Sequence, residues 1–209
     1  MNTAMIIETR NIPKLQTIIE SHLKMLPSDW KCIVYCERTN IRTVNSKIPV
    51  EFRKLHNNNP DINKLLTDKS FLIDIGVDKL LMFQHDTDIL STNIRDFEEW
   101  DYVGAPWSWA NDAPGGNGGL SVRSIKAMLD TIENVPYEST VNEDVYYSRN
   151  LIGKVAPRSV CDKFSCESVF ALNTYGCHAI ERYLTHSQCE QIKNQKNKFS
   201  KNYIFSIDI

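Results

Sequence analysis

Residues 79–88 read KLLMFQHDTD, an apolar run followed at once by two aspartates. The apolar residues at 80–83 predict a buried strand, which ends just before Asp86 and Asp88. Paired carboxylates beside a buried strand are costly without a counter-charge, and their oxygens suit Mg²⁺ or Mn²⁺, which often bridge to a diphosphate. The sequence therefore predicts a metal site where this strand ends. A solvated acidic turn is the alternative.

Strands and helices alternate on both sides of this strand. The apolar pattern predicts strands at 4–8, 31–35, 50–55, 79–84 and 101–107, and helices at 15–26, 61–75, 125–132 and 142–151. The segment 111–119 between them holds four of the eight glycines. A strand–helix–strand unit in about 35 residues implies parallel strands joined by a right-handed crossover. We therefore predict an α/β domain over 1–184 with ligands at the carboxyl ends of its strands. The polar segment 185–209 is predicted to be a terminal helix or a linker.

The composition is that of one ordinary globular domain. Of the 209 residues, 42% are hydrophobic and 24% are charged, which allows a full core and excludes a disordered tail or a disulfide-stapled miniprotein. Lys and Arg number 24 against 26 Asp and Glu, for a net charge of −2 and a pI near 6.2. This balance argues against nucleic-acid binding by bulk electrostatics, so we expect any anionic ligand to be held at a local site.

The first residues, the apolar runs and the cysteines bear on where the chain resides. No cationic segment precedes an apolar stretch at the start, so we expect no signal peptide. The longest apolar runs, at 4–7 and 80–83, are far too short to span a membrane. The six cysteines form no Cys-x-x-Cys pair, which favours free buried thiols in a reducing compartment over a zinc site. These features predict a cytoplasmic protein without a membrane span.

Two further segments and one histidine supply candidate site residues. The run GGNGG at 115–119 is either a flexible surface loop or a backbone that approaches a ligand closely, which only glycine permits. Glu143 and Asp144 follow Asn142, a predicted N-cap. They either stabilise the helix dipole or supply one carboxylate as a general base. His178 is structural unless it meets the acidic pair in space.

Five motifs occur in one order along the chain. They are LMFQHDTD at 81–88, WDYVGAPW at 100–107, GNGGLSVRS at 116–124, NEDV at 142–145 and FSCE at 164–167. In this order they resemble the motifs of GT-A-like glycosyltransferases. The second and third motifs are specific to that family, whereas each of the others is a weak signal by itself. The chain also resembles the N-terminal domains of larger chlorovirus enzymes of this class that act on capsid glycans. His85 and Cys166 stand where this family usually has Thr and Val.

The resemblance implies a single GT-A domain with a Rossmann-like, mixed and mainly parallel sheet flanked by helices. It also implies a nucleotide-diphosphate sugar bound through Mn²⁺ or Mg²⁺, and a larger multidomain viral protein in the host cytoplasm. The implied site residues are Asp86, Asp88 and His178 for the metal, Asp86 with Thr9 and Arg10 for the nucleotide, Asn117, Gly118 and Gly119 for the donor sugar, and Asp144 or Glu143 as the catalytic carboxylate.

These features together predict a metal-dependent glycosyltransferase. It would move a hexose or deoxyhexose from a UDP-linked donor to a hydroxyl of a glycan or glycoprotein acceptor. In an inverting enzyme Asp144 deprotonates that hydroxyl, and in a retaining enzyme it contacts the sugar. The first alternative is a nucleotidyltransferase or phosphohydrolase that uses the same acidic pair. The second is a non-catalytic glycan-binding module in which Trp107 and Trp109 stack on sugar rings.

Overall fold

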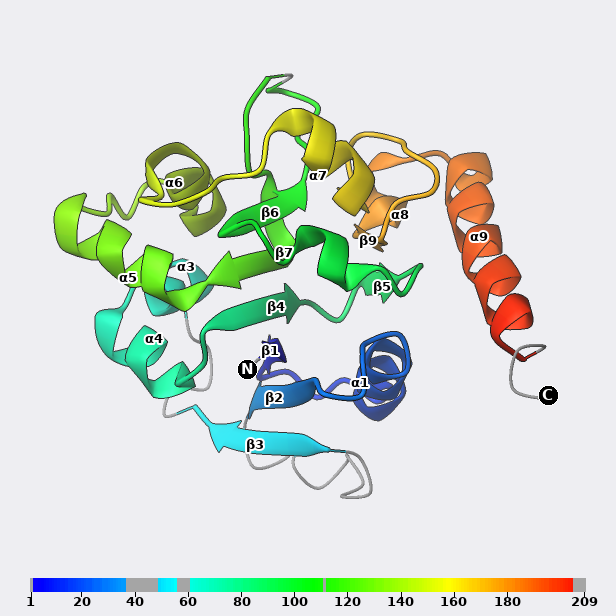
Figure 1. The fold of residues 1–209 in the computed structure, drawn as a ribbon, viewed down its shortest axis with the longest axis horizontal. Helices are drawn as coiled ribbons and strands as arrows, with labels where there is room; N and C mark the ends of the chain where they lie inside the picture. Colours follow the sequence, from blue (N-terminus) through cyan, green and yellow to red (C-terminus); the bar gives the residue numbers. More distant parts are fainter. Residues whose placement is uncertain (1, 37–48, 56–60, 111, 205–209) are drawn as a thin grey trace.

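A six-stranded sheet with the strand order β3-β2-β1-β4-β7-β6 forms the centre of the fold (Figure 1). The computed structural model describes residues 2–36, 49–55, 61–110 and 112–204. The strands of this sheet are β1 (Asn2–Glu8), β2 (Lys31–Cys36), β3 (Val50–Lys54), β4 (Lys79–Phe83), β6 (Tyr102–Ala105) and β7 (Asn117–Ser124). All five predicted strands are therefore confirmed, and β7 is an addition.

The sheet is mixed, with four parallel strands running from the β3 edge to β4. β1 pairs in parallel with β2 and with β4, and β2 pairs in parallel with β3. β7 runs antiparallel to both β4 and β6, so β6 points in the same direction as β4. This topology confirms the predicted α/β class with a mixed, mainly parallel sheet.

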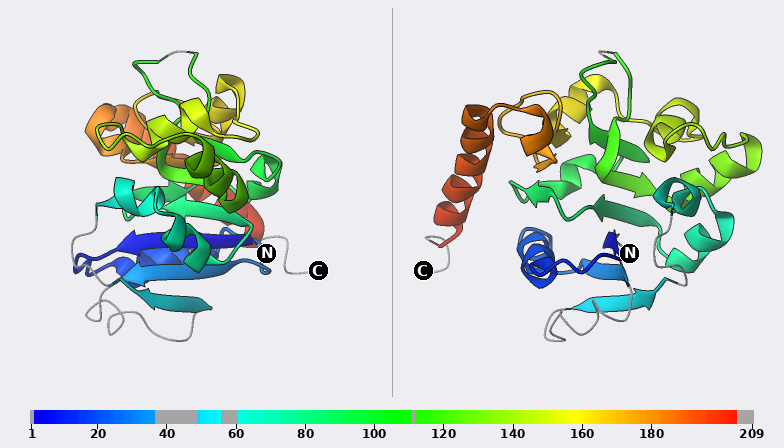
Figure 2. Two further views of the ribbon diagram at one scale, coloured as in Figure 1. Left: turned by 90° about the vertical axis from the view of Figure 1, so that its left-hand side faces the viewer. Right: turned by 180° about the vertical axis from the view of Figure 1, so that it is seen from behind.

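Helices cover both faces of the sheet (Figure 2). One face is covered by α1 (Leu15–Leu23), η1 (Ile94–Phe97) and α7 (Arg158–Phe164), and the other by α3 (Ile62–Leu66), α4 (Lys69–Ile75), α5 (Ile125–Asn134) and α6 (Glu143–Asn150). The prediction of one helix over 61–75 was wrong, because the Asp68 side chain accepts a hydrogen bond from the Phe71 N–H and starts α4 as a separate helix.

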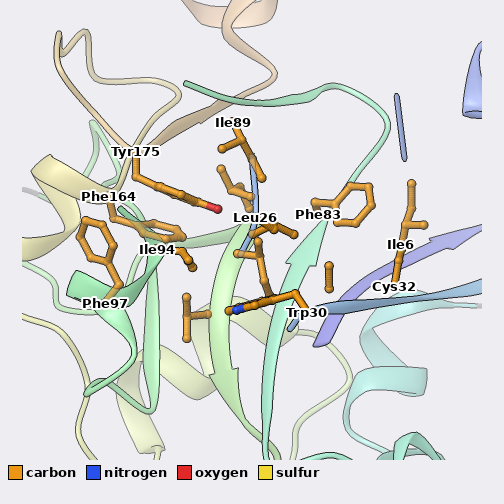
Figure 3. Close-up of a cluster of buried hydrophobic side chains, with 14 of the residues drawn as sticks. Ile6, Leu26, Trp30, Cys32, Phe83, Ile89, Ile94, Phe97, Phe164 and Tyr175 are labelled. Carbon is orange, nitrogen blue, oxygen red and sulfur yellow. The ribbon is translucent and has the colours of Figure 1, made fainter. Parts of the chain in front are cut away.

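Alternating side chains of the central strands build two hydrophobic cores. Ala4 and Ile6 of β1 point into the first core, where they join Phe83 and Phe164 (Figure 3). Met5, which lies between them, points into the second core under α4, α5 and α6. Because β1 and β4 are buried on both faces, their carboxyl ends are held rigidly at one edge of the sheet.

The glycine-rich segment differs most from its prediction. A flexible surface loop was one of the two interpretations of the run at 115–119, but β7 begins inside this run at Asn117. A Cβ atom on Gly104 of β6 would lie 2.0 Å from the Asn117 carbonyl oxygen, and one on Gly116 would lie 2.2 Å from that of Ala105. The prediction of a loop was therefore wrong at its end, because these glycines are needed for close approach of two strands.

A second, three-stranded sheet lies beyond the end of β4. Its order is β5-β9-β8, with β5 (Thr87–Ile89), β9 (Gly176–His178) and β8 (Ser165–Cys166), and it is followed by α8 (Ile180–Tyr183) and α9 (His186–Ile204). Cys189 and Ile192 of α9 are buried with Cys166 and Cys177 of the small sheet. The first turns of α9 therefore pack on this sheet, and the helix lies at one side of the molecule (Figure 1).

The six cysteines are free thiols, and all of them are buried, as predicted. Burial raises the pKa of Cys32 to about 12, so this thiol stays protonated at neutral pH. Within the described ranges, no helix combines the length and the apolar character that a membrane crossing requires.

Candidate functional site

Three neighbouring strands bring the predicted site residues to one edge of the sheet. β1 and β4 end there at Glu8 and Phe83, and β7 begins there, because Phe83 pairs with Leu120. Thr9 and Arg10 follow β1, and residues 84–88 follow β4. Residues 117–119 extend β7 past the end of β4. These segments are far apart in the sequence but adjacent in the sheet, as expected for a site at strand ends.

A pocket of about 280 Å³ lies at the ends of β1 and β4. Its polar lining comes from Glu8, Thr9, Arg10, Gln84 and His85, and its apolar lining from Ile7, Ile62 and Met82. The buried Glu8 carboxylate accepts two hydrogen bonds from the Arg10 side chain, each 2.8 Å long. Arg10 Nη2 also lies 2.9 Å from His85 Nδ1. Glu8 therefore holds the exposed Arg10 guanidinium at the mouth of this pocket.

His178 lies between two carboxylates at the end of β9, where it pairs with Thr87 of β5. Its Nδ1 is 3.0 Å from Glu167 Oε1, and its Nε2 is 3.1 Å from Gln84 Oε1 and 3.4 Å from Asp86 Oδ1. Burial by itself would lower the pKa of His178, but Asp86 and Glu167 outweigh it and raise the pKa to about 9. At neutral pH the imidazole is therefore positively charged and bridges Glu167 and Asp86.

The Asp86 carboxylate is surrounded by basic side chains. Besides His178, Arg182 Nη2 lies 3.3 Å from Asp86 Oδ2, and His85 Nδ1 lies 3.9 Å from Oδ1. Burial would raise the pKa of Asp86, but His178 and His85 lower it to about 2. Acidic and basic groups alternate here, since Glu167 also pairs with His178 and Glu8 with Arg10. The largely exposed guanidinium groups of Arg10 and Arg182 are the ones that can reach an anionic ligand.

The residues around Asp86 fit a divalent cation in part. Asp86 Oδ1 is buried and accepts no hydrogen bond from the described residues, although His178 Nε2 lies 3.4 Å from it as an ion-pair partner. A buried carboxylate oxygen beside an imidazole nitrogen is a suitable pair of ligands. Asp88 is placed differently, opposite Cys177 in the β5–β9 pair. In the part of the chain that the structure describes, no three His, Cys, Asp or Glu side chains form a ready metal cluster.

Helix α1 fixes the turn that contains Asp86. The Thr87 hydroxyl donates to the Gln84 carbonyl oxygen over 2.7 Å and lies 2.8 Å from His22 Nε2. The His22 ring in turn stacks on Phe83, the last residue of β4, at a centroid distance of 4.3 Å. These buried contacts leave the backbone around Asp86 little freedom, as a preorganised site requires.

Gly118 and Gly119 make room for side chains of the protein itself. A Cβ atom on Gly119 would lie 2.2–2.6 Å from three atoms of the His178 ring. A Cβ atom on Gly118 would lie 2.3 Å from Arg123 Nη2. The Asn117 side chain accepts a hydrogen bond from the Gly119 N–H over 2.7 Å and so closes this turn. The start of β7 therefore packs directly against His178.

The two candidate catalytic carboxylates, Glu143 and Asp144, differ in their partners. Glu143 is buried, and both of its oxygens accept hydrogen bonds from the fully buried Arg123, at 2.6 and 3.0 Å. Burial raises the pKa of Glu143, while Arg123 opposes this shift. Asp144 is half-buried, and its oxygens accept hydrogen bonds from the N–H groups of Gly118 and Val145. The helix start is held by Asn63, whose side chain accepts from the Glu143 N–H.

Sequence reasoning missed three residues of this site. Glu167 lies in the FSCE motif, but nothing local shows that its carboxylate meets His178. Arg182 lies on α8 and reaches Asp86 across a long sequence separation. Arg123 is a charged residue in a buried strand, so the hydrophobic pattern alone hides its role.

The chain belongs to the family described as "Protein of unknown function (DUF5672)", which matches residues 46–178. Its structure is similar to the crystal structure of the glycosyltransferase GlyE from Streptococcus pneumoniae TIGR4, with a TM-score of 0.46 and 13% sequence identity. The similarity covers 70% of this chain and 42% of GlyE, so the chain matches less than half of that protein. A search of curated proteins found no match.

Proposed function

We propose that this chain is a metal-dependent glycosyltransferase that uses a UDP-linked sugar as its donor. The main support is the buried Asp86 Oδ1 next to His178 Nε2, with the other ring nitrogen bonded to Glu167. A metal-ligating histidine commonly gives its second N–H to a carboxylate, which fixes the tautomer. A cation bound at His178 Nε2 would displace the proton that this nitrogen otherwise carries at neutral pH. The mixed oxygen and nitrogen pair favours Mn²⁺ over Mg²⁺, whose ligands are mainly oxygens. Asp88 remains the third proposed ligand.

The basic groups around this pair suit the donor diphosphate. Arg182 is largely exposed and close to Asp86, so its guanidinium can turn toward phosphate oxygens, which it matches as a two-pronged donor. The pocket lined by Thr9 and Arg10 lies next to it and is the proposed place of the nucleotide. Once bound, the cation would stabilise the negative charge of the leaving diphosphate.

Of the two carboxylates at the start of α6, we assign the catalytic role to Asp144. Glu143 is engaged through both oxygens by Arg123, and its proposed role is to hold that buried guanidinium. Asp144 accepts two backbone hydrogen bonds, and an ionised carboxylate has about four acceptor positions in all. It can therefore still accept a proton from an acceptor hydroxyl or contact the donor sugar.

Donor binding that depends on the metal is the first expected result. The melting temperature of the protein should rise by several degrees with a UDP-sugar plus Mn²⁺, and by much less with either alone. A ligand at 100 times its Kd, bound only to the folded state, adds about 2.7 kcal/mol. The measurement is a thermal-shift series with UDP-, GDP- and dTDP-sugars, each with Mn²⁺ or with EDTA.

Incubations of the protein and Mn²⁺ with a UDP-sugar and a sugar acceptor, and in parallel with a nucleoside triphosphate, separate the competing functions. Product analysis by NMR distinguishes a transferred sugar from free sugar and from a hydrolysed or transferred nucleotide. Stabilisation by UDP-sugars that persists unchanged in EDTA would contradict the proposed metal dependence. Consumption of a nucleoside triphosphate without sugar transfer would favour the nucleotidyltransferase alternative.

A further inference from the structure

Two stacked tryptophans lie in the loop that follows β6. The rings of Trp107 and Trp109 have centroids 4.9 Å apart and planes inclined by 26°. Trp107 is 7% exposed, whereas Trp109 is 62% exposed. The Trp107 carbonyl oxygen also accepts a hydrogen bond from Arg158 Nη1 over 3.5 Å. The Trp107 ring is thus held in place and covers one face of Trp109, and the rest of that indole is open to ligands.

This aromatic pair lies at the same edge of the sheet as the candidate site. β6 points in the same direction as β4, so its carboxyl end is at the edge where β4 ends. The Ser108 N–H donates a 3.1 Å hydrogen bond to Ser168 Oγ. Ser168 directly follows Glu167, which contacts His178. One short chain of contacts therefore links the tryptophan loop to the Asp86–His178 pair.

The chemistry around Trp109 fits the ring of a sugar. Ser108, next to Trp109, is exposed, and so are Asp112 and Pro114 further along the chain, so the exposed indole lies in a segment of mainly polar or small exposed side chains. A pyranose has the same character, because its C–H face is apolar and its rim carries hydroxyl groups. A stable protein partner would need a much larger apolar contact area than one indole.

We propose that the Trp107–Trp109 pair is the acceptor subsite, with Trp109 stacked on the sugar ring of the acceptor glycan. That the bound sugar is the acceptor rests on the proposed function, whereas sugar binding at Trp109 can be tested by itself. The subsite contributes binding and orientation of the acceptor, and no chemical step is assigned to either tryptophan.

The test measures binding of methyl pyranosides in the absence of donor. The probes are the methyl glycosides of glucose, galactose, mannose, xylose, fucose and rhamnose. Their binding to the full chain is measured by saturation-transfer NMR. We expect Trp109→Ala to weaken binding about ten-fold, and Trp109→Phe to retain most of it, because a flat ring remains. Ile73→Ala is the matched control, since Ile73 is 57% exposed on a different element, α4, and should leave binding unchanged.

Two outcomes would overturn the subsite. They are the absence of saturation transfer to every glycoside in the wild-type protein, and equal binding by the wild-type protein and Trp109→Ala. The thermal shift with UDP-sugar and Mn²⁺ is recorded on the same variants and should not change. If the wild-type protein shows no thermal shift with UDP-sugar and Mn²⁺, the proposed function alone is contradicted. If this shift is present but Trp109→Ala leaves glycoside binding unchanged, the subsite alone is contradicted.

Discussion

Replacing Asp86 by Asn should reduce kcat/KM for sugar transfer by about 10³-fold, or about 4 kcal/mol of transition-state stabilisation. Asn has the same shape but lacks the charge that faces His178 and Arg182. The substitution would therefore weaken binding of the cation and would also disturb the positions of the basic groups around the diphosphate. The measurement is steady-state kinetics with saturating Mn²⁺, together with the melting temperature of each variant.

Asp29→Asn is the control for this experiment. Asp29 is exposed and pairs with Arg95 at the surface, so its loss should change neither activity nor melting temperature appreciably. A folded Asp86→Asn enzyme that keeps its activity within ten-fold of the wild type would contradict the role given to Asp86.

The second large effect concerns stability. Glu143→Gln and Arg123→Met should each lower the free energy of unfolding by about 3–5 kcal/mol, because each leaves a buried charge without its partner. Arg123 has no exposed surface, and its guanidinium also donates to the Gly118 carbonyl oxygen over 3.1 Å. The measurement is urea unfolding of the single variants and of the double variant.

The double variant separates an ion pair from simple packing. Removing both charges leaves neither group unpaired, so the double variant should lose clearly less than the sum of the two single losses. Losses of less than about 1 kcal/mol in the free energy of unfolding of the single variants, or strictly additive losses in the double variant, would contradict a stabilising Arg123–Glu143 ion pair. Because Gly118 lies between Arg123 and Asp144, the single variants should also reduce activity.

Much of the fold could be predicted because the central strands are buried on both faces. β1 and β4 therefore appear in the sequence as short continuous apolar runs. β7 was not predicted, since Gly118 and Gly119 near its start have no side chains to show a period. The break between α3 and α4 depends on a single cap at Asp68, which a weak helical pattern does not reveal.

The candidate site shows the same division between local and long-range signals. Asp86 could be found because an acidic pair directly follows a buried strand. Of its partners, His178 was named only through the family resemblance and Arg182 was missed, because they come from β9 and α8, which reach Asp86 through the pairing of β5 with β9. The glycines at 118 and 119 were noticed for their possible closeness to a ligand, but their nearest neighbours are Arg123 and His178.

The position of a bound Mn²⁺ ion tests the central claim most directly. Crystals grown with UDP and Mn²⁺ can be measured at the manganese absorption edge, where anomalous scattering locates the ion without assumptions about its ligands. We predict one strong peak within bonding distance of an Asp86 oxygen, an Asp88 oxygen and His178 Nε2, with diphosphate oxygens completing the coordination. A peak elsewhere, or ordered UDP with no manganese at Asp86, would contradict the account.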